Sequence, residues 1–149
     1  DRLASEGLPI NLAISLHAAN DVMRSKLMPV NNRYPIADVV AAAGRYATKT
    51  GRRVTYEYTL IEGVNSSRAD AAELARLISG QLAHINLIPV NPIKEKGFFP
   101  PAPSAVQSFL EYLEKHGVPV SLRKTMGDDI AAACGQLRAQ QQGKSGGVE

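Results

Sequence analysis

Short apolar segments and longer amphipathic segments alternate along the whole of this 149-residue chain. Apolar runs of strand length occupy residues 11–16, 54–60, 84–88 and 119–122. Between them, apolar residues recur at helical spacing; Pro35 and Ser66 or Ser67 mark two helix starts, and Gly51 and Gly80 mark their ends. This rhythm predicts parallel strands joined by right-handed crossovers, and therefore an α/β fold.

A third helix is expected after a proline-rich stretch. Residues 89–103 carry five of the nine prolines, which excludes regular structure there. Ser104 and Gln107 have the spacing of a capping box, so the helix is expected to begin at Ser104 and to end at Gly117. Four strands are too few to close an eight-stranded barrel, so the sheet is either open or part of something larger.

The chain has a single cysteine, Cys134. One thiol excludes an intrachain disulfide framework and any metal cluster held by several thiolates of this chain. No apolar run approaches the roughly 20 residues that a membrane-spanning helix needs, and nothing at the start resembles a signal peptide. With 44% hydrophobic and 21% charged residues, the composition predicts a reduced globular domain in the cytoplasm, without membrane contact.

Polar residues follow two of the predicted strands at their carboxyl ends, where parallel α/β folds place their ligands. Ser15, Leu16 and His17 end the first strand, and Asn91 follows the third. A histidine there can be a general base, a metal ligand or a hydrogen-bond donor, or can be satisfied by the next loop. Asn91 can bind a ligand or bond its own turn. No second histidine or carboxylate lies at metal-ligand spacing, so no metal site is expected.

The net charge is only +3, but basic residues gather at two places. These are Arg45, Lys49, Arg52 and Arg53, followed later by Arg123 and Lys124. Arg45 and Lys49 are four residues apart and would share one face of a helix. Such groups can hold phosphates, or can form a solvated surface. A stand-alone RNA-binding module is therefore one alternative, although 5% aromatic residues leave few side chains for stacking on bases.

Three segments together resemble the C-terminal half of the radical S-adenosylmethionine RNA methyltransferases of the RlmN and Cfr family. They are SLHA at residues 15–18, HINLIPVNP at 84–92 and RKTMGDDIAAACGQL at 123–137. The resemblance covers about residues 11–137, in the same order and at the right separations. It implies that residues 1–137 form the C-terminal part of a partial (β/α)6 barrel with a C-terminal extension. Residues 138–149 would be a flexible tail.

The resemblance also implies an activity. RlmN enzymes methylate C2 of an adenosine in 23S rRNA and of an adenosine in the tRNA anticodon loop, whereas Cfr relatives methylate C8. The shared terminal motif does not separate these branches, and the commoner RlmN type is preferred. Cys134 matches the methyl-carrying cysteine. Ser15, Leu16, His17 and Asn91 match residues that bind S-adenosylmethionine.

Cofactors and partners follow from the same resemblance. The Cys134 thiolate would take a methyl group from one S-adenosylmethionine, and a second, cleaved on a [4Fe-4S] cluster, would generate the radical that activates this methyl. A reductant protein would serve the cluster, and 23S rRNA and tRNA would be the substrates. The family's Cys-x3-Cys-x2-Cys loop and its further N-terminal cysteine cannot be present, because Cys134 is the only cysteine. We therefore expect a fragment that is inactive alone and that, through exposed strand edges and apolar surface, either self-associates or is poorly soluble.

Overall fold

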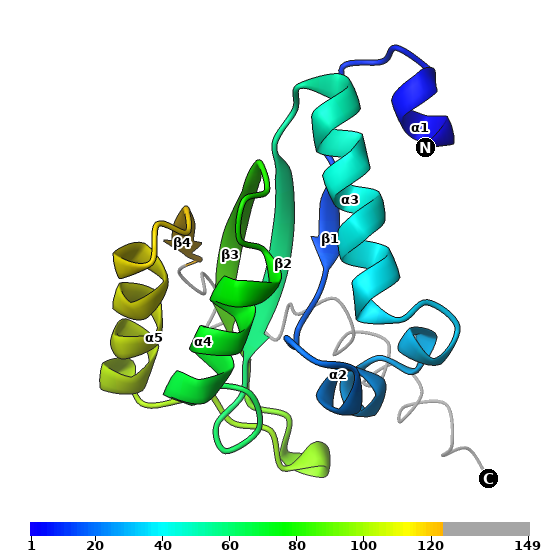
Figure 1. Ribbon diagram of the computed structural model, residues 1–149. Helices are drawn as coiled ribbons and strands as arrows, with labels where there is room; N and C mark the ends of the chain where they lie inside the picture. Colours follow the sequence, from blue (N-terminus) through cyan, green and yellow to red (C-terminus); the bar gives the residue numbers. More distant parts are fainter. Residues whose placement is uncertain (124–149) are drawn as a thin grey trace, which may run out of the picture.

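Four parallel strands form one sheet whose spatial order follows the chain, β1-β2-β3-β4 (Figure 1). The strands are β1 (Ala13–Ser15), β2 (Val54–Leu60), β3 (Ala83–Pro89) and β4 (Val120–Leu122). All three neighbouring pairs are parallel, which confirms the predicted α/β class. The structure is a computed structural model that describes residues 1–123. Cys134 and the tail expected at residues 138–149 lie outside the described residues.

One short helix precedes β1, and the other helices connect successive strands. They are α1 (Arg2–Ser5), α2 (Asp21–Leu27), α3 (Ile36–Thr50), α4 (Arg68–Leu77) and α5 (Pro103–Lys115), with the 3-10 turns η1 (Pro29–Asn32) and η2 (Lys94–Lys96). Helix α3 begins after Pro35 and ends at Gly51, whose φ of 66° is left-handed. Ser67 caps α4 in a reciprocal capping box with Asp70. These signals agree with the predictions, except that α4 ends at Leu77 and not at the predicted Gly80.

The capping box expected at Ser104 is wrong. Helix α5 begins one residue earlier, at Pro103, with Ala102 as its N-cap and no side-chain cap. Proline suits the first helical position because its fixed φ is helical and its missing N–H would have no partner there. The Gln107 amide donates instead to Glu111 Oε1 at 2.9 Å, one turn further along the helix.

One face of the sheet packs on the helices and the other is polar. On β2 the side chains of Val54, Tyr56, Tyr58 and Leu60 are buried, whereas the alternating residues Thr55, Glu57 and Thr59 are only half-buried. The same alternation runs along β3. The buried side chains join those of α3, α4 and α5 in a single core.

The polar face matters because all-parallel sheets are normally covered by apolar contacts on both faces. Within residues 1–123, helices pack on one face of the sheet only, as they do in the wall of a partial barrel. The face without helices would then be the one turned toward the barrel interior. Within residues 1–123, no helix is both long and apolar enough to cross a membrane.

Candidate functional site

The chain turns sharply where β1 ends, at the lower end of the sheet in Figure 1. The backbone N–H groups of Leu16 and His17 both donate to the Glu57 carbonyl of β2, at 2.9 and 3.2 Å. His17 has a φ of 57°, a left-handed conformation that non-glycine residues rarely adopt. Ser15 is exposed on the polar face, whereas the Leu16 side chain is fully buried in the core.

The His17 ring is held by the end of β2. Its Nδ1 accepts a hydrogen bond from the Thr59 backbone N–H at 3.1 Å. An Nδ1 that accepts cannot carry the proton, so the ring is the neutral tautomer with its proton on Nε2. Burial lowers the pKa of His17, and the charge of Arg24 lowers it further, while Glu57 opposes them. His17 is therefore a half-buried ring whose Nδ1 is satisfied by backbone, which leaves its Nε2–H as the group that could donate to a ligand.

This geometry predicts the titration of His17. Because burial disfavours the imidazolium, we expect ring protonation only below the ordinary pKa of about 6.5, and an Nε2–H tautomer at neutral pH. Ring ¹⁵N shifts recorded between about pH 5 and pH 8 measure both the pKa and the tautomer of His17, because this range extends roughly one unit or more to either side of the ordinary histidine pKa. The two outcomes that contradict the assignment are a titration at or above the ordinary pKa and an Nδ1–H tautomer.

Asn65 ties the β1 turn to the loop after β2. It is 1% exposed, and its Nδ2 donates to the carbonyls of His17 and Thr59 at 2.8 and 2.7 Å. Its Oδ1 accepts from the Ile61 N–H at 2.8 Å, and its own carbonyl accepts from the Tyr58 hydroxyl at 2.9 Å. One buried amide thus fixes the turn, the end of β2 and the loop to one another.

A buried arginine lies behind the turn. Arg24 of α2 is 3% exposed, and its Nε and Nη2 donate to the carbonyls of Leu16 and Ser15, each at 3.2 Å. Its Nη1 donates to Asn31 Oδ1 at 2.7 Å. The Asn31 amide in turn donates to Asp21 Oδ1 at 2.8 Å. Hydrogen bonds from Ile36 and Asn31 lower the pKa of Asp21, so this carboxylate stays ionised.

A polar row crosses the face of the sheet that no helix of residues 1–123 covers. Strand register aligns Ser15, Glu57, Asn86 and Ser121 on four successive strands. The Asn86 amide donates to both carboxylate oxygens of Glu57, at 3.0 and 3.3 Å. The row presents hydroxyl, carboxylate and amide groups in the register of a barrel interior, where a purely structural barrel would place apolar side chains.

Asn91 lies at the same edge of the sheet, two residues beyond β3, and is half-buried. The Val90 N–H donates to the Leu60 carbonyl at 3.0 Å, which fixes the chain there to the end of β2. Within the described part of the chain, the Asn91 side chain forms no hydrogen bond with a partner. The structure thus places Asn91 at the same end of the sheet as the Ser15–His17 turn.

No group of three or more potential metal ligands occurs among residues 1–123. Cys134, the expected methyl carrier, is not among these residues.

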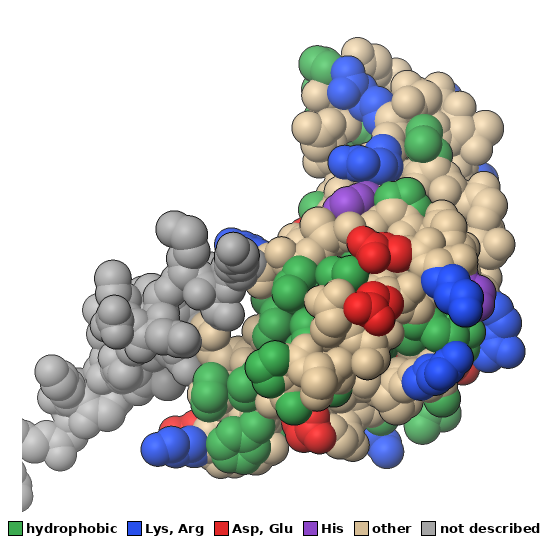
Figure 2. Space-filling model, turned by 90° about the vertical axis from the view of Figure 1, so that its left-hand side faces the viewer, with side chains coloured by type: hydrophobic (Ala, Val, Ile, Leu, Met, Phe, Trp, Pro, Cys, Tyr) green, Lys and Arg blue, Asp and Glu red, His purple; other side chains and the backbone are tan. Residues whose placement is uncertain are grey.

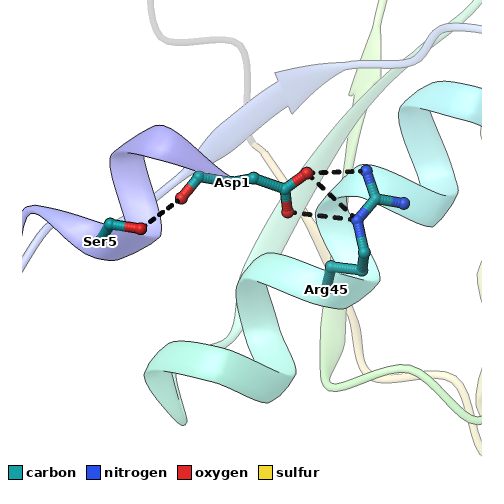
Figure 3. Close-up of polar contacts among 3 residues, drawn as sticks. All are labelled: Asp1, Ser5 and Arg45. Carbon is teal, nitrogen blue, oxygen red and sulfur yellow. Dashed lines mark hydrogen bonds and ion pairs between the residues drawn. The ribbon is translucent and has the colours of Figure 1, made fainter.

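Two of the basic residues have local partners. Arg45 and Lys49 lie on one face of α3, as predicted, and bond the N-cap and the last residue of α1. Arg45 pairs with Asp1 at 3.1 Å (Figure 3), and Lys49 donates to Ser5 Oγ at 2.7 Å. The ion pair is more than half exposed, so it contributes little to stability. Figure 2 shows basic side chains in separate groups with acidic ones between them, and no continuous basic surface on that face.

Sequence reasoning did not identify Arg24, Glu57 or Asn86 as site residues. The alternation of polar and aromatic residues in 54–60 is a signal that could have found Glu57, because it predicts a strand with one polar face. Arg24 carries no such signal, since an arginine on a short helix resembles any exposed one.

Comparisons with known proteins agree with these features. A scan against protein-family models found no match. The chain is 56% identical over 144 residues to a probable dual-specificity RNA methyltransferase RlmN of Symbiobacterium thermophilum, covering 96% of this chain and 39% of that protein. It is 51% identical to the protein of the same name in Desulforudis audaxviator, covering 97% and 45%.

Two solved structures extend the comparison. A radical SAM methyltransferase from Sphaerobacter thermophilus superposes with a TM-score of 0.87 at 52% identity, covering 91% of this chain and 40% of that one. A domain of a pyruvate-formate lyase-activating enzyme from Bacteroides vulgatus, at 18% identity and a TM-score of 0.59, shares the fold alone. The chain therefore spans about two fifths of the length of the curated relatives above.

Proposed function

The chain belongs to the RlmN family of radical S-adenosylmethionine methyltransferases, and from this premise we propose that it is the C-terminal part of an RNA methyltransferase. The complete protein, called the full-length enzyme below, transfers a methyl group to C2 of an adenosine in 23S rRNA and in the tRNA anticodon loop. It does so in the cytoplasm, with electrons from a reductant protein.

The observation that carries the proposal is the His17 turn. A ring whose Nδ1 is occupied by the Thr59 amide offers one fixed Nε2–H donor at the carboxyl edge of the sheet. The exposed Ser15 hydroxyl and the Asn91 amide lie at the same edge. A donor, a hydroxyl and an amide suit a ligand that carries both donors and acceptors, as S-adenosylmethionine does. Leu16 is fully buried, so its part is to anchor the turn.

Cys134 has a different role in this proposal. Its thiolate is the nucleophile that accepts the methyl group from S-adenosylmethionine and holds it as a thioether. An adenine ring carbon is electron-poor and would not attack a methyl donor directly, so a protein-held methyl group is needed first.

The residues of this chain do not fit a [4Fe-4S] cluster. Such clusters are held by several thiolates, and this chain has one cysteine. We assign the cluster to the part of the full-length enzyme that lies outside this chain.

The proposal is tested with the full-length enzyme, prepared without oxygen and supplied with S-adenosylmethionine, a reductant protein and an RNA fragment. Mass spectrometry of the digested RNA is expected to show 2-methyladenosine. Finding 8-methyladenosine would assign the chain to the Cfr branch. RNA that is bound but not methylated would favour the binding-module alternative.

Asn91 offers a narrower test. Changing Asn91 to alanine removes a donor and an acceptor that no other described residue uses, so we expect the dissociation constant for S-adenosylmethionine to rise about tenfold. Calorimetric titration of the anaerobic full-length enzyme measures this constant. Asn32→Ala, an exposed asparagine on η1, is the matched control and should leave it unchanged. Equal affinities for both variants would remove Asn91 from the site.

A further inference from the structure

Arg24 is a buried cation on which, within residues 1–123, Asp21 acts only through its charge and through Asn31, without a direct bond. Its side chain is 3% exposed, and no acidic group forms an ion pair with it within residues 1–123. Burying a guanidinium costs several kcal/mol unless its N–H groups are well bonded. The bonds that offset this cost go mainly to backbone carbonyls, which carry only partial charges. A methionine or leucine would fill a similar volume without that cost, so packing alone does not explain why a charged residue occupies this position.

The carbonyls that Arg24 binds belong to two consecutive residues of one turn. Nη2 holds the Ser15 carbonyl and Nε holds the Leu16 carbonyl, each at 3.2 Å. Two neighbouring peptide planes are therefore fixed by one rigid, planar group. The next residue is His17, whose left-handed backbone needs support from its surroundings.

Arg24 is itself held in place. Its Nη1 donates to Asn31 Oδ1 at 2.7 Å and to the Tyr34 carbonyl at 3.3 Å. Asn31 is also 3% exposed, and its amide is oriented by Asp21 Oδ1 and Ser25 Oγ, at 2.8 and 2.9 Å. The guanidinium thus has one available orientation, with its fork directed at the turn.

We infer that Arg24 is a positioning residue for S-adenosylmethionine binding: it fixes the Ser15 and Leu16 peptide planes so that the Ser15 hydroxyl and the His17 ring face the ligand. This inference rests on the proposed function. Arg24 does not touch the ligand, and the charge it brings beside the turn also favours the neutral form of His17.

The test compares Arg24→Gln, Arg24→Lys and the control Arg33→Gln in the anaerobic full-length enzyme. Arg33 is exposed, lies on the segment after η1 and stacks on Tyr34, without bonding the turn. Calorimetry measures the dissociation constant for S-adenosylmethionine well below the melting temperature of each variant. Ring ¹⁵N spectra report the His17 tautomer.

We expect Arg24→Gln to weaken binding by about tenfold or more, because bonds from a charged donor to two carbonyls are lost. Arg24→Lys retains the charge but loses the fork, so its loss should be similar. The unique His17 Nε2–H signal should be replaced by mixed tautomers in both variants, whereas Arg33→Gln should change neither readout.

Three outcomes separate the possibilities. If the wild type binds no S-adenosylmethionine, the proposed function fails. If the wild type binds and folded Arg24 variants bind equally well with an unchanged His17 signal, Arg24 is merely structural and the inference is overturned. If neither Arg24 variant folds, Asn31→Ala serves as the test, because it removes the acceptor of Arg24 Nη1. We expect this variant to bind S-adenosylmethionine about threefold more weakly. An unchanged affinity of Asn31→Ala also overturns the inference.

Discussion

Changing Cys134 to alanine in the full-length enzyme is expected to lower the rate of RNA methylation by a factor on the order of 10⁴ or more, as loss of a covalent nucleophile does elsewhere. The physical reason is that no other thiolate of this chain can accept the methyl group and hold it as a thioether. This chain contains no second cysteine that could take its role. The readout is methylated adenosine in digested RNA, measured by mass spectrometry in single-turnover and multiple-turnover reactions.

The control for this prediction is the affinity of the variant for S-adenosylmethionine, which is measured separately from its rate of methylation. Alanine is smaller than cysteine, so the substitution adds no bulk and should leave the dissociation constant for S-adenosylmethionine within about twofold of the wild type. Intact-protein mass spectrometry should find wild-type protein carrying one added methyl group and the variant carrying none. Normal turnover by Cys134→Ala would show that another group carries the methyl.

The strands and helices could be predicted well wherever the local signals were complete. Residues 54–60 were predicted as a strand and are one, because β-branched and aromatic residues alternate there between two turns. The first strand was predicted over residues 11–16 but is only Ala13–Ser15. Its length is set by pairing with Thr55, Tyr56 and Glu57 of β2, which no local pattern in residues 11–16 records.

The position of the candidate site in the fold could be predicted from the sequence, but the hydrogen bonds within it could not. The carboxyl ends of parallel strands pointed to His17 and Asn91, and the structure puts both at that edge. The hydrogen bonds that hold the site together join residues far apart in sequence. The Asn65 amide donates to the carbonyl of His17, 48 positions earlier, and the Thr59 N–H donates to the His17 ring, 42 positions earlier. Such contacts depend on strand register, and the amide of Asn65 resembles that of any loop asparagine until the register is known.

Among these substitutions, Asn65→Ala is expected to have the second largest effect. It should lower both the stability of the fold and the affinity for S-adenosylmethionine. Asn65 is 1% exposed, and its side chain makes hydrogen bonds to the Ile61 N–H and to the carbonyls of His17 and Thr59. Alanine leaves one buried and two part-buried backbone groups unpaired, so we expect a loss of about 3 kcal/mol in the free energy of unfolding. Because one of them is the His17 carbonyl, the affinity for S-adenosylmethionine should fall at least about tenfold.

Asn65→Asp distinguishes lost volume from lost hydrogen bonding. Aspartate has the same shape and can still accept from Ile61, but its second oxygen faces the carbonyls of His17 and Thr59, which also only accept. Three acceptors in one buried place repel one another, so near neutral pH this variant should be as unstable as Asn65→Ala. Protonation restores one donor, and since burial raises the pKa of a carboxyl group, lowering the pH should recover part of the stability. Thermal melts across pH of Asn65→Asp and the exposed control Asn32→Asp measure this; a pH dependence shared by both variants would exclude a specific role for the Asn65 amide.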